Sequence, residues 1–118
     1  MARWTVEVIP AAERELKVLP DELQGKFLHV AGILEEFGPG RVGLPHVRPL
    51  EGKLWEMRLA GRDAIARAIY FAASGRRLVV VRVFVKKSQK TPRREIALAA
   101  RRMKEQDGGQ QDPQAASQ

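Results

Sequence analysis

Apolar residues follow two different periods along the first third of this 118-residue chain. Over residues 3–9 they alternate with polar residues, which predicts a strand. After Pro10 they recur every three or four positions, which is the period of an amphipathic helix. Pro20 interrupts that period, so we predict two consecutive helices that form a helical hairpin. The apolar stripe of the second helix consists of Leu23, Phe27, Val30, Leu34 and Phe37.

Short alternating segments replace the helical period after residue 53. The segments LWEMRL, AIARAIYFA and LVVVRVFV are rich in β-branched and aromatic residues, and the turn sequences AGRD and SGRR separate them. Short turns join antiparallel neighbours, so we predict a three-stranded antiparallel meander to which the first strand pairs. Strict alternation along the third strand places one set of side chains on a single face: Leu78, Val80, Arg82, Phe84 and Lys86.

One more helix follows the meander. Thr91 and Pro92 are typical of a helix cap and a first-turn proline, and apolar residues recur from Ile96 to Met103. That period does not continue beyond residue 106, so we expect a disordered tail over 107–118. The patterns together predict an α+β fold in a single domain, 1–106. It contains an N-terminal strand, a helical hairpin, an antiparallel three-stranded meander joined by the first strand, and a C-terminal helix.

Charge is unevenly distributed along the chain. The net charge is +7, but residues 53–104 hold fifteen bases against three acids. The segment VFVKKSQKTPRREIALAARR, residues 83–102, carries many lysines and arginines and a single acid, Glu95. Like charges repel, so such a cluster costs stability unless a polyanion neutralises it. Arginine outnumbers lysine in this half, and its planar fork suits phosphate, so the charge pattern predicts nucleic acid as the partner.

Composition argues against several other classes of protein. The chain has no cysteine, and its two histidines, His29 and His46, are not spaced as a metal pair on one helix, so we expect neither a metal nor a cofactor. The serines lack an obvious partner base, and GPGRVG lacks the lysine of a phosphate-binding loop. The N-terminus has no secretory pattern, and the longest apolar run is too short to cross a bilayer. We therefore expect a cytoplasmic protein without membrane contact.

The basic surface of the meander is the best remaining candidate for a site. Arg58 and Arg82 are expected to project together, with Phe84 and Lys86 continuing the same surface and Tyr70 in the same sheet. Aromatic rings among cations are typical of single-stranded RNA recognition, through base stacking and phosphate contacts. Core packing explains Phe84 and Tyr70 equally well.

Three segments occur in an order that resembles a known family. LWEMRL, then RAIY, then LVVVRVFVKKSQKTPRREIALA are similar to the RelE/HigB-type bacterial toxins, in the phage-related branch of the RelE/ParE superfamily. That branch has a Leu-Trp-Glu-x-Arg strand, an Arg-x-x-Tyr strand and a Phe-x-Lys-Lys-x-x-Lys-Thr-Pro segment in this order. The resemblance implies a RelE-like fold over residues 4–104. It also implies a toxin that cuts messenger RNA in the ribosome and is neutralised by a cognate antitoxin, expected to be a helix-turn-helix protein.

The resemblance also implies which residues form the site. Arg58 stands at the arginine of the first motif, and Arg67 and Tyr70 stand at the Arg-x-x-Tyr positions. By strict alternation Arg67 faces away from Tyr70, so either a bulge re-aims Arg67 or its own face is exposed at the end of the strand. The third motif contributes Phe84, Lys86, Lys87, Lys90 and Thr91.

RNA carries its own nucleophile, the 2′-hydroxyl, so the protein must align the strand, accept a proton and stabilise the phosphorane charge. Arginines would stabilise that charge, and a lysine among other cations loses its proton more easily and is therefore the expected base. We expect the catalytic residues to be Arg67, Lys86, Lys87, Lys90 and Tyr70. We expect the RNA-binding residues to be Arg58, Arg82, Phe84, Thr91, Arg93 and Arg94.

Two other functions remain open from the sequence. A ParE-like toxin of the same superfamily would inhibit DNA gyrase through protein contact and would do no RNA chemistry. A plain nucleic-acid-binding module would show strongly salt-dependent binding without cleavage. The lysine-rich segment after the third strand favours RNA cleavage over gyrase inhibition.

Overall fold

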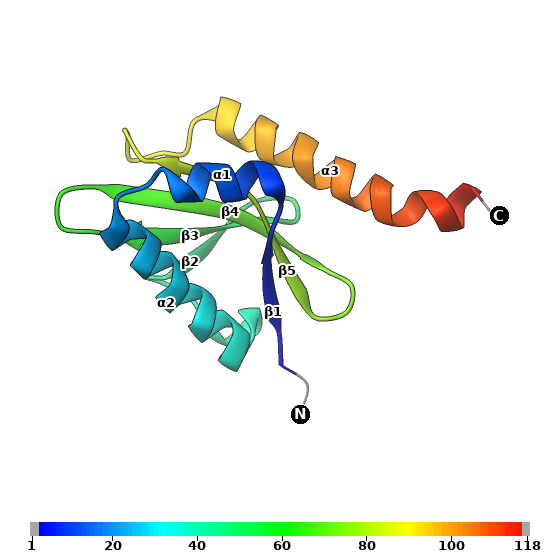
Figure 1. Ribbon diagram of the computed structural model, residues 1–118, viewed down its shortest axis with the longest axis horizontal. Helices are drawn as coiled ribbons and strands as arrows, with labels where there is room; N and C mark the ends of the chain where they lie inside the picture. Colours follow the sequence, from blue (N-terminus) through cyan, green and yellow to red (C-terminus); the bar gives the residue numbers. More distant parts are fainter. Residues whose placement is uncertain (1–2, 117–118) are drawn as a thin grey trace.

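The computed structural model describes the backbone of residues 3–116 and the side chains of residues 3–106. Figure 1 shows α1 across the upper part of the sheet and α2 at its lower left. The helix α3 lies above the sheet and extends well past the strands to the right. The elements, in chain order, are β1 (Thr5–Val8), α1 (Pro10–Lys17), α2 (Asp21–Phe37), the 3-10 turn η1 (Pro39–Arg41), β2 (Val47–Glu51), β3 (Leu54–Ala60), β4 (Ile65–Ala73), β5 (Arg77–Val85) and α3 (Arg93–Ala116).

The five strands form one sheet in the order β1-β5-β4-β3-β2. The four strands from β2 to β5 are antiparallel, and β1 pairs in parallel with β5. This confirms the predicted α+β fold, in which the first strand joins an antiparallel meander. The meander has four strands instead of the predicted three, because β2 was missed. Its sequence VRPLE has no apolar alternation and contains Pro49, a residue that a strand accepts at the edge of a sheet, where β2 lies.

A bulge in β5 changes which side chains share a face. Ile69 of β4 pairs with Arg82, and the next residue, Tyr70, pairs with Val80, so Val81 is an extra residue in β5. Residues of β5 before the bulge therefore switch faces relative to those after it. The strict alternation predicted from residue 78 to residue 86 is wrong for this reason, and Arg82 lies on the face opposite that of Val80.

The apolar stripe of α2 packs against the sheet, as predicted, over most of its length. Leu23, Phe27, Val30 and Leu34 are all buried in the core. Phe37, the last residue of the predicted stripe, belongs to the last turn of the helix and is 52% exposed, so the buried part of the stripe ends at Leu34.

Side chains of two helices cover the edge of β5 that β1 leaves open. β1 pairs with β5 only as far as Val80. Beyond that point Glu15 of α1 accepts a hydrogen bond from the Val83 amide (3.1 Å), and Arg102 of α3 donates to the Val81 carbonyl (2.9 Å). These bonds satisfy backbone groups that a strand would otherwise pair, and they fix α1 and α3 beside the end of β5.

The start of α3 differs from its prediction. The carbonyl of Pro92 accepts from the amides of Glu95 and Ile96, so the helix begins at Arg93 and Pro92 precedes it. Pro92 and not Thr91 directly precedes the helix, so the predicted role of Thr91 as a helix cap is wrong, and its hydroxyl donates to Glu56 of the sheet instead. The backbone is helical as far as Ala116, into the segment predicted as a tail, whose side chains and last two residues lie outside the described part. None of the described helices is long and apolar enough to span a bilayer.

Candidate functional site

Two rows of side chains cross one face of the sheet near its lysine-rich end. Directly opposed residues of antiparallel strands share a face, and the register places Arg58, Arg67 and Phe84 in one row across β3, β4 and β5. The neighbouring row runs from β2 to β5 and consists of Arg48, Glu56, Ile69 and Arg82. The sheet therefore brings together the predicted residues Arg58, Arg67, Arg82 and Phe84.

The loop after β5 folds back over these rows. Residues 86–91, here called the lysine loop, carry Lys86, Lys87 and Lys90 and lead into α3. The Arg67 guanidinium donates through one nitrogen to the Thr91 hydroxyl (2.6 Å) and through the other to the Gln89 carbonyl (2.7 Å). Both contacts hold the loop against the sheet.

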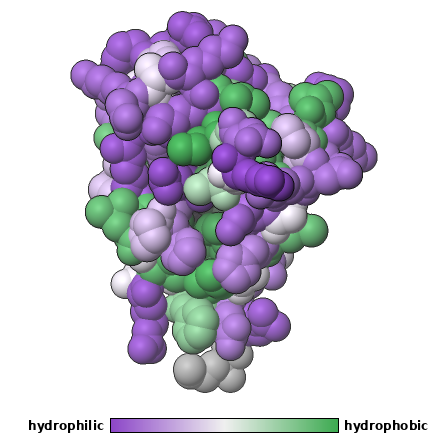
Figure 2. All heavy atoms as spheres, turned by 90° about the vertical axis from the view of Figure 1, so that its left-hand side faces the viewer, coloured by the Kyte–Doolittle hydropathy of each residue, from purple (hydrophilic) through white to green (hydrophobic). Residues whose placement is uncertain are grey.

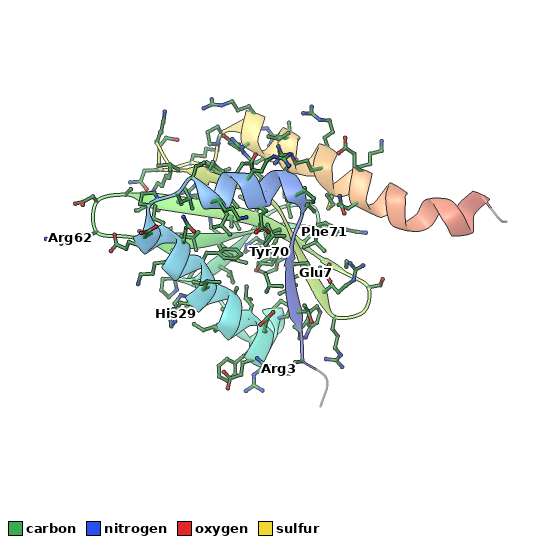
Figure 3. All side chains as sticks on the ribbon, viewed as in Figure 1. Arg3, Glu7, His29, Arg62, Tyr70 and Phe71 are labelled. Carbon is green, nitrogen blue, oxygen red and sulfur yellow. The ribbon has the colours of Figure 1, made fainter. Side chains whose placement is uncertain are left out.

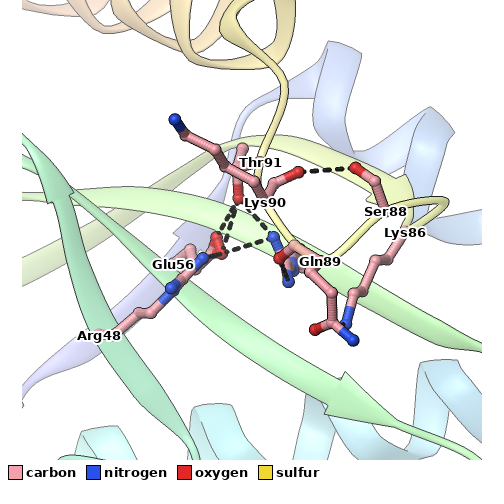
Figure 4. A network of polar contacts seen from close by, with 8 residues as sticks. Arg48, Glu56, Lys86, Ser88, Gln89, Lys90 and Thr91 are labelled. Atoms are coloured by element: carbon pink, nitrogen blue, oxygen red, sulfur yellow. Dashed lines mark hydrogen bonds and ion pairs between the residues drawn. The ribbon is translucent and has the colours of Figure 1, made fainter.

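Glu56 is a buried carboxylate under the lysine loop, with 2% of its surface exposed. Its oxygens accept a hydrogen bond from the Thr91 hydroxyl (2.6 Å to Oε2) and pair with Arg67 Nη1 (3.4 Å) and Arg48 Nη2 (3.3 Å). A buried charge is tolerated when it is paired in this way. Figure 4 shows two of these partners, Arg48 from a neighbouring strand and Thr91 from the loop, converging on Glu56.

Neither Glu56 nor Arg48 was assigned to the site from the sequence. Glu56 carried a usable signal, because alternation in LWEMRL places it on the same polar face as Arg58. Its burial, however, depends on the loop that covers it. Arg48 carried no such signal, because the strand that positions it was itself missed.

Two concavities meet at Lys86. The first, about 210 Å³, is lined by Arg48, Glu56, Arg58, Arg67, Lys86 and Gln89 among others. The second concavity, about 250 Å³, is lined by Arg82, Phe84, Lys86, Lys87, Lys90 and Arg94 among others. Hydrophilic side chains dominate the upper part of the face shown in Figure 2, with hydrophobic ones between them towards the middle.

The surrounding charge changes the acidity of Lys86. Partial burial lowers the pKa of its ammonium group, and the nearby guanidinium groups of Arg67, Arg58 and Arg48 lower it further, while Glu56 acts in the opposite direction. A larger fraction of Lys86 is therefore a neutral amine near neutral pH than of an ordinary lysine. Burial also lowers the pKa of Arg67, with Glu56 opposing the shift, but a guanidinium remains charged in a protein.

Internal carboxylates neutralise some of the predicted cations. Arg82 pairs with Glu95 (2.6 Å) and Glu15 (2.6 Å), which raises its pKa, and it also lies 5.7 Å from the centre of the Phe84 ring. Arg93 pairs with Glu51 of β2 at the surface. The cations that form no ion pair with the described side chains include Arg58, Lys86, Lys87, Lys90 and Arg94.

Tyr70 lies on the opposite face of the sheet from Arg67. It pairs with Trp55 and Val80, and it is 1% exposed. Its hydroxyl makes no hydrogen bond within the described part of the chain, and burial raises its pKa. Figure 3 shows Tyr70 in the interior of the molecule, and it lines an apolar cavity of about 570 Å³ with Trp55 and Leu78. The structure therefore separates Tyr70 from the cationic face.

Thr91 and Phe84 lie at the site but are covered. Thr91 is 3% exposed, and its hydroxyl is shared between Glu56 and Arg67. Phe84 is 9% exposed, so only part of its ring borders the second concavity. The exposed cations of this face are consequently Arg48, Arg58, Lys87, Lys90, Arg93 and Arg94, with Lys86 partly exposed.

The fold and the position of its cationic face define the class of protein. Its architecture is RelE-like: an archaeal RelE in a RelE–RelB complex from Pyrococcus horikoshii OT3 superposes with a TM-score of 0.54. That chain is 24% identical, and the match covers 72% of this chain and 96% of the archaeal one. The chain belongs to the family described as phage-derived protein Gp49-like (DUF891), whose model matches residues 14–104. No curated protein matches its sequence.

Proposed function

We propose that this protein is the toxin of a type II toxin–antitoxin system and that it cleaves translated messenger RNA on the ribosome. One observation carries the proposal: each of the four neighbouring strands β2 to β5 contributes one cation to the same concavity, within the strand or directly after it. These cations are Arg48 of β2, Arg58 of β3, Arg67 of β4 and Lys86 directly after β5. These four cations exceed the single negative charge of Glu56 in the same concavity, and the excess suits a phosphate group that gains negative charge in a transition state.

The RNA, these side chains and water supply the groups that the reaction uses. The neutral amine of Lys86 accepts the proton of a 2′-hydroxyl, and the 2′-oxygen attacks the adjacent phosphorus. The bond from phosphorus to the 5′-oxygen breaks, the 5′-oxygen takes up a proton from water, and Lys86 returns the proton that it accepted to solvent. The products are a 2′,3′-cyclic phosphate and a 5′-hydroxyl. Arg58 and Arg48 stabilise the phosphorane, which carries one more negative charge than the starting phosphate.

The remaining cations bind the RNA on either side of the cleaved bond. Lys87, Lys90 and Arg94 border the second concavity and would contact neighbouring phosphates. The buried Arg67 and Thr91 act by holding the lysine loop, and Tyr70 is assigned no step because it lies on the other face.

The partners follow from the same proposal. The archaeal RelE of similar fold is in a complex with RelB, so we propose an antitoxin that covers the cationic face of this chain. We also propose that the ribosome aligns the message in the site and that the protein acts in the cytoplasm. An antitoxin with acidic segments would suit a chain of net charge +7.

The test is to induce the chain in bacteria and map the 5′ ends of two messages. One message is translated, and the other is identical except that its start codon is destroyed. New ends on the translated message alone are expected. Lys86→Gln should abolish them, whereas Lys53→Gln, a change at an exposed lysine in the β2–β3 turn, should not. A parallel assay for gyrase-linked DNA breaks examines the alternative function. Such breaks with intact messages would refute RNA cleavage and favour a ParE-like toxin.

A further inference from the structure

Few hydrogen bonds attach the lysine loop to the sheet beyond its first residue. Its first residue, Lys86, continues β5 by donating its amide to the Ile65 carbonyl (2.7 Å). Lys87, Ser88, Gln89 and Lys90 are all exposed. The next buried residue is Thr91, and its hydroxyl is bonded to Glu56 and Arg67. The position of the loop between these two ends therefore depends on how Thr91 is held.

Thr91 and Arg67 converge on the same carboxylate. The Thr91 hydroxyl accepts from Arg67 Nη1 (2.6 Å) and donates to Glu56 Oε2 (2.6 Å), while Arg67 Nη1 lies 3.4 Å from Glu56 Oε1. The second guanidinium nitrogen of Arg67 donates to the Gln89 carbonyl, in the middle of the loop. Because Arg67 is 5% exposed, both of its terminal nitrogens serve the loop and not the solvent.

Glu56 is the member of this network that organises the other two. Without the Glu56 charge, the Arg67 guanidinium would be buried near Arg48, Arg58 and Lys86 with no acid to balance them. Repulsion between these cations would then destabilise the position of Arg67. Without the Glu56 oxygens, the Thr91 hydroxyl would lose its acceptor. Water cannot easily take the place of the Glu56 carboxylate, because this side chain lies beneath the loop and is 2% exposed.

We infer that Glu56 is a positioning residue for RNA cleavage: with Arg67 and Thr91 it latches the lysine loop onto the sheet and so holds Lys86 beside Arg58 and Arg48. This inference rests on the proposed function for its catalytic consequence, but the latch itself is a property of the free protein. Glu56 and Thr91 contact no RNA in this scheme. Their loss should therefore lower the rate of the chemical step and leave RNA binding by the exposed lysines largely intact.

The latch is tested on the full-length chain by hydrogen exchange of its backbone amides. Thr91→Val removes the hydroxyl at nearly constant volume, and Thr91→Ser retains it. We expect Thr91→Val and Glu56→Gln to speed exchange at least tenfold at the amide of Lys86, the loop amide that donates to the Ile65 carbonyl, while exchange within β3, β4 and β5 stays close to that of the unmodified protein. Thr91→Ser should restore the slow exchange. The matched control is Glu51→Gln, an acid that pairs with Arg93 at the surface and does not touch the loop.

Cleavage of a ribosome-bound message provides the second readout. A displacement of about 1 Å in a catalytic group can cost about a hundredfold in rate, so Thr91→Val should lower kcat by roughly ten- to a hundredfold with KM within about threefold of its original value. Thr91→Ser should recover most of kcat. A purely structural role would not lower kcat while KM stays the same. It would also not depend on the Thr91 hydroxyl alone.

The outcomes separate the latch from the proposed function. Unchanged exchange in the loop of Thr91→Val, or faster exchange spread evenly over β3 to β5, would overturn the latch. Equal losses of kcat in Thr91→Val and Thr91→Ser would overturn the positioning role. Selective loop exchange in a protein that cleaves no message in any form would leave the latch standing and refute RNA cleavage.

Discussion

Replacing Arg67 by methionine tests the buried network through the stability of the fold. Methionine keeps a long flexible side chain but removes the guanidinium that bonds Thr91, the Gln89 carbonyl and Glu56. The Glu56 carboxylate then remains buried with only two donors, Arg48 and Thr91. An incompletely paired charge in the interior should destabilise the folded state.

The size of the effect follows from this environment. Removing one partner of a buried ion pair costs about 3–5 kcal/mol, and because Glu56 retains two donors we expect the lower end, about 3 kcal/mol. For a domain of this length, 1 kcal/mol corresponds to roughly 3–5 °C in Tm, so Tm should fall by about 10–15 °C. That loss is a large fraction of the free energy of unfolding of an ordinary domain, about 5–15 kcal/mol.

Urea unfolding followed by circular dichroism measures the loss for Arg67→Met, Glu56→Gln and the double variant. Neutralising Glu56 removes the unpaired charge that Arg67→Met leaves behind, so the double variant should lose at least about 1 kcal/mol less than the sum of the single losses. Arg62→Met, at an exposed arginine of the β3–β4 turn visible in Figure 3, should stay within about 0.5 kcal/mol. A loss below about 1 kcal/mol for Arg67→Met, or strictly additive losses, would refute the buried network.

Three further predictions concern single side chains. The cleavage rate should rise with pH through the lowered pKa of Lys86, because the base acts as a neutral amine, and Lys86→Arg should remove that rise in a pH–rate profile. Tyr70→Phe removes a buried hydroxyl that has no partner in the described part, so urea unfolding should show unchanged or slightly higher stability, and cleavage should be unchanged. Arg102→Met removes the side chain that donates to the Val81 carbonyl at the unpaired edge of β5, and this should lower the free energy of unfolding by about 1–3 kcal/mol. Faster amide exchange near Val81 would be the measured sign of that loss.

The stability prediction changes how mutations in this site are interpreted. Arg67→Ala, a natural choice for testing catalysis, would remove two contacts with the loop, one with Glu56, and part of the stability of the fold at once. Loss of toxicity in that variant would therefore say little about chemistry. Lys86 is a better position for that question, because it is part exposed and forms one weak contact, with Gln89 (3.4 Å).

Periodicity alone was sufficient for most of the secondary structure. The helices α1 and α2 and the strand β3 each have one face that is more buried than the other, so the period of their apolar residues gives their type and approximate bounds. The strands β4 and β5 are buried on both faces, and their β-branched and aromatic residues between turn sequences identify them instead. Two prolines mark the helix starts at residues 10 and 21. The strand β2 could not be found in this way, because it lies at the edge of the sheet and only its pairing with β3 defines it.

The sequence also identified the cationic nature of the site, and the resemblance supplied most of its members. Charge density is a property of composition, so the lysine loop and the start of α3 were recognised without a structure. Which cations are free depends on contacts between distant residues. Arg82 is bound by acids from α1 and α3, 67 and 13 positions away, and sequence spacing gives no measure of such contacts.

The amino-acid sequence by itself determined the helices, every strand except β2, and the sign of the charge near the end of β5, because these depend on local period and composition. The tertiary structure decided the rest: the bulge at Val81 that sets the face of Arg82, the opposite placement of Tyr70, and the burial of Glu56 beneath the lysine loop. Each of these depends on strand register and on packing between segments far apart in the chain, and a shift of one residue would reverse the face of every side chain involved.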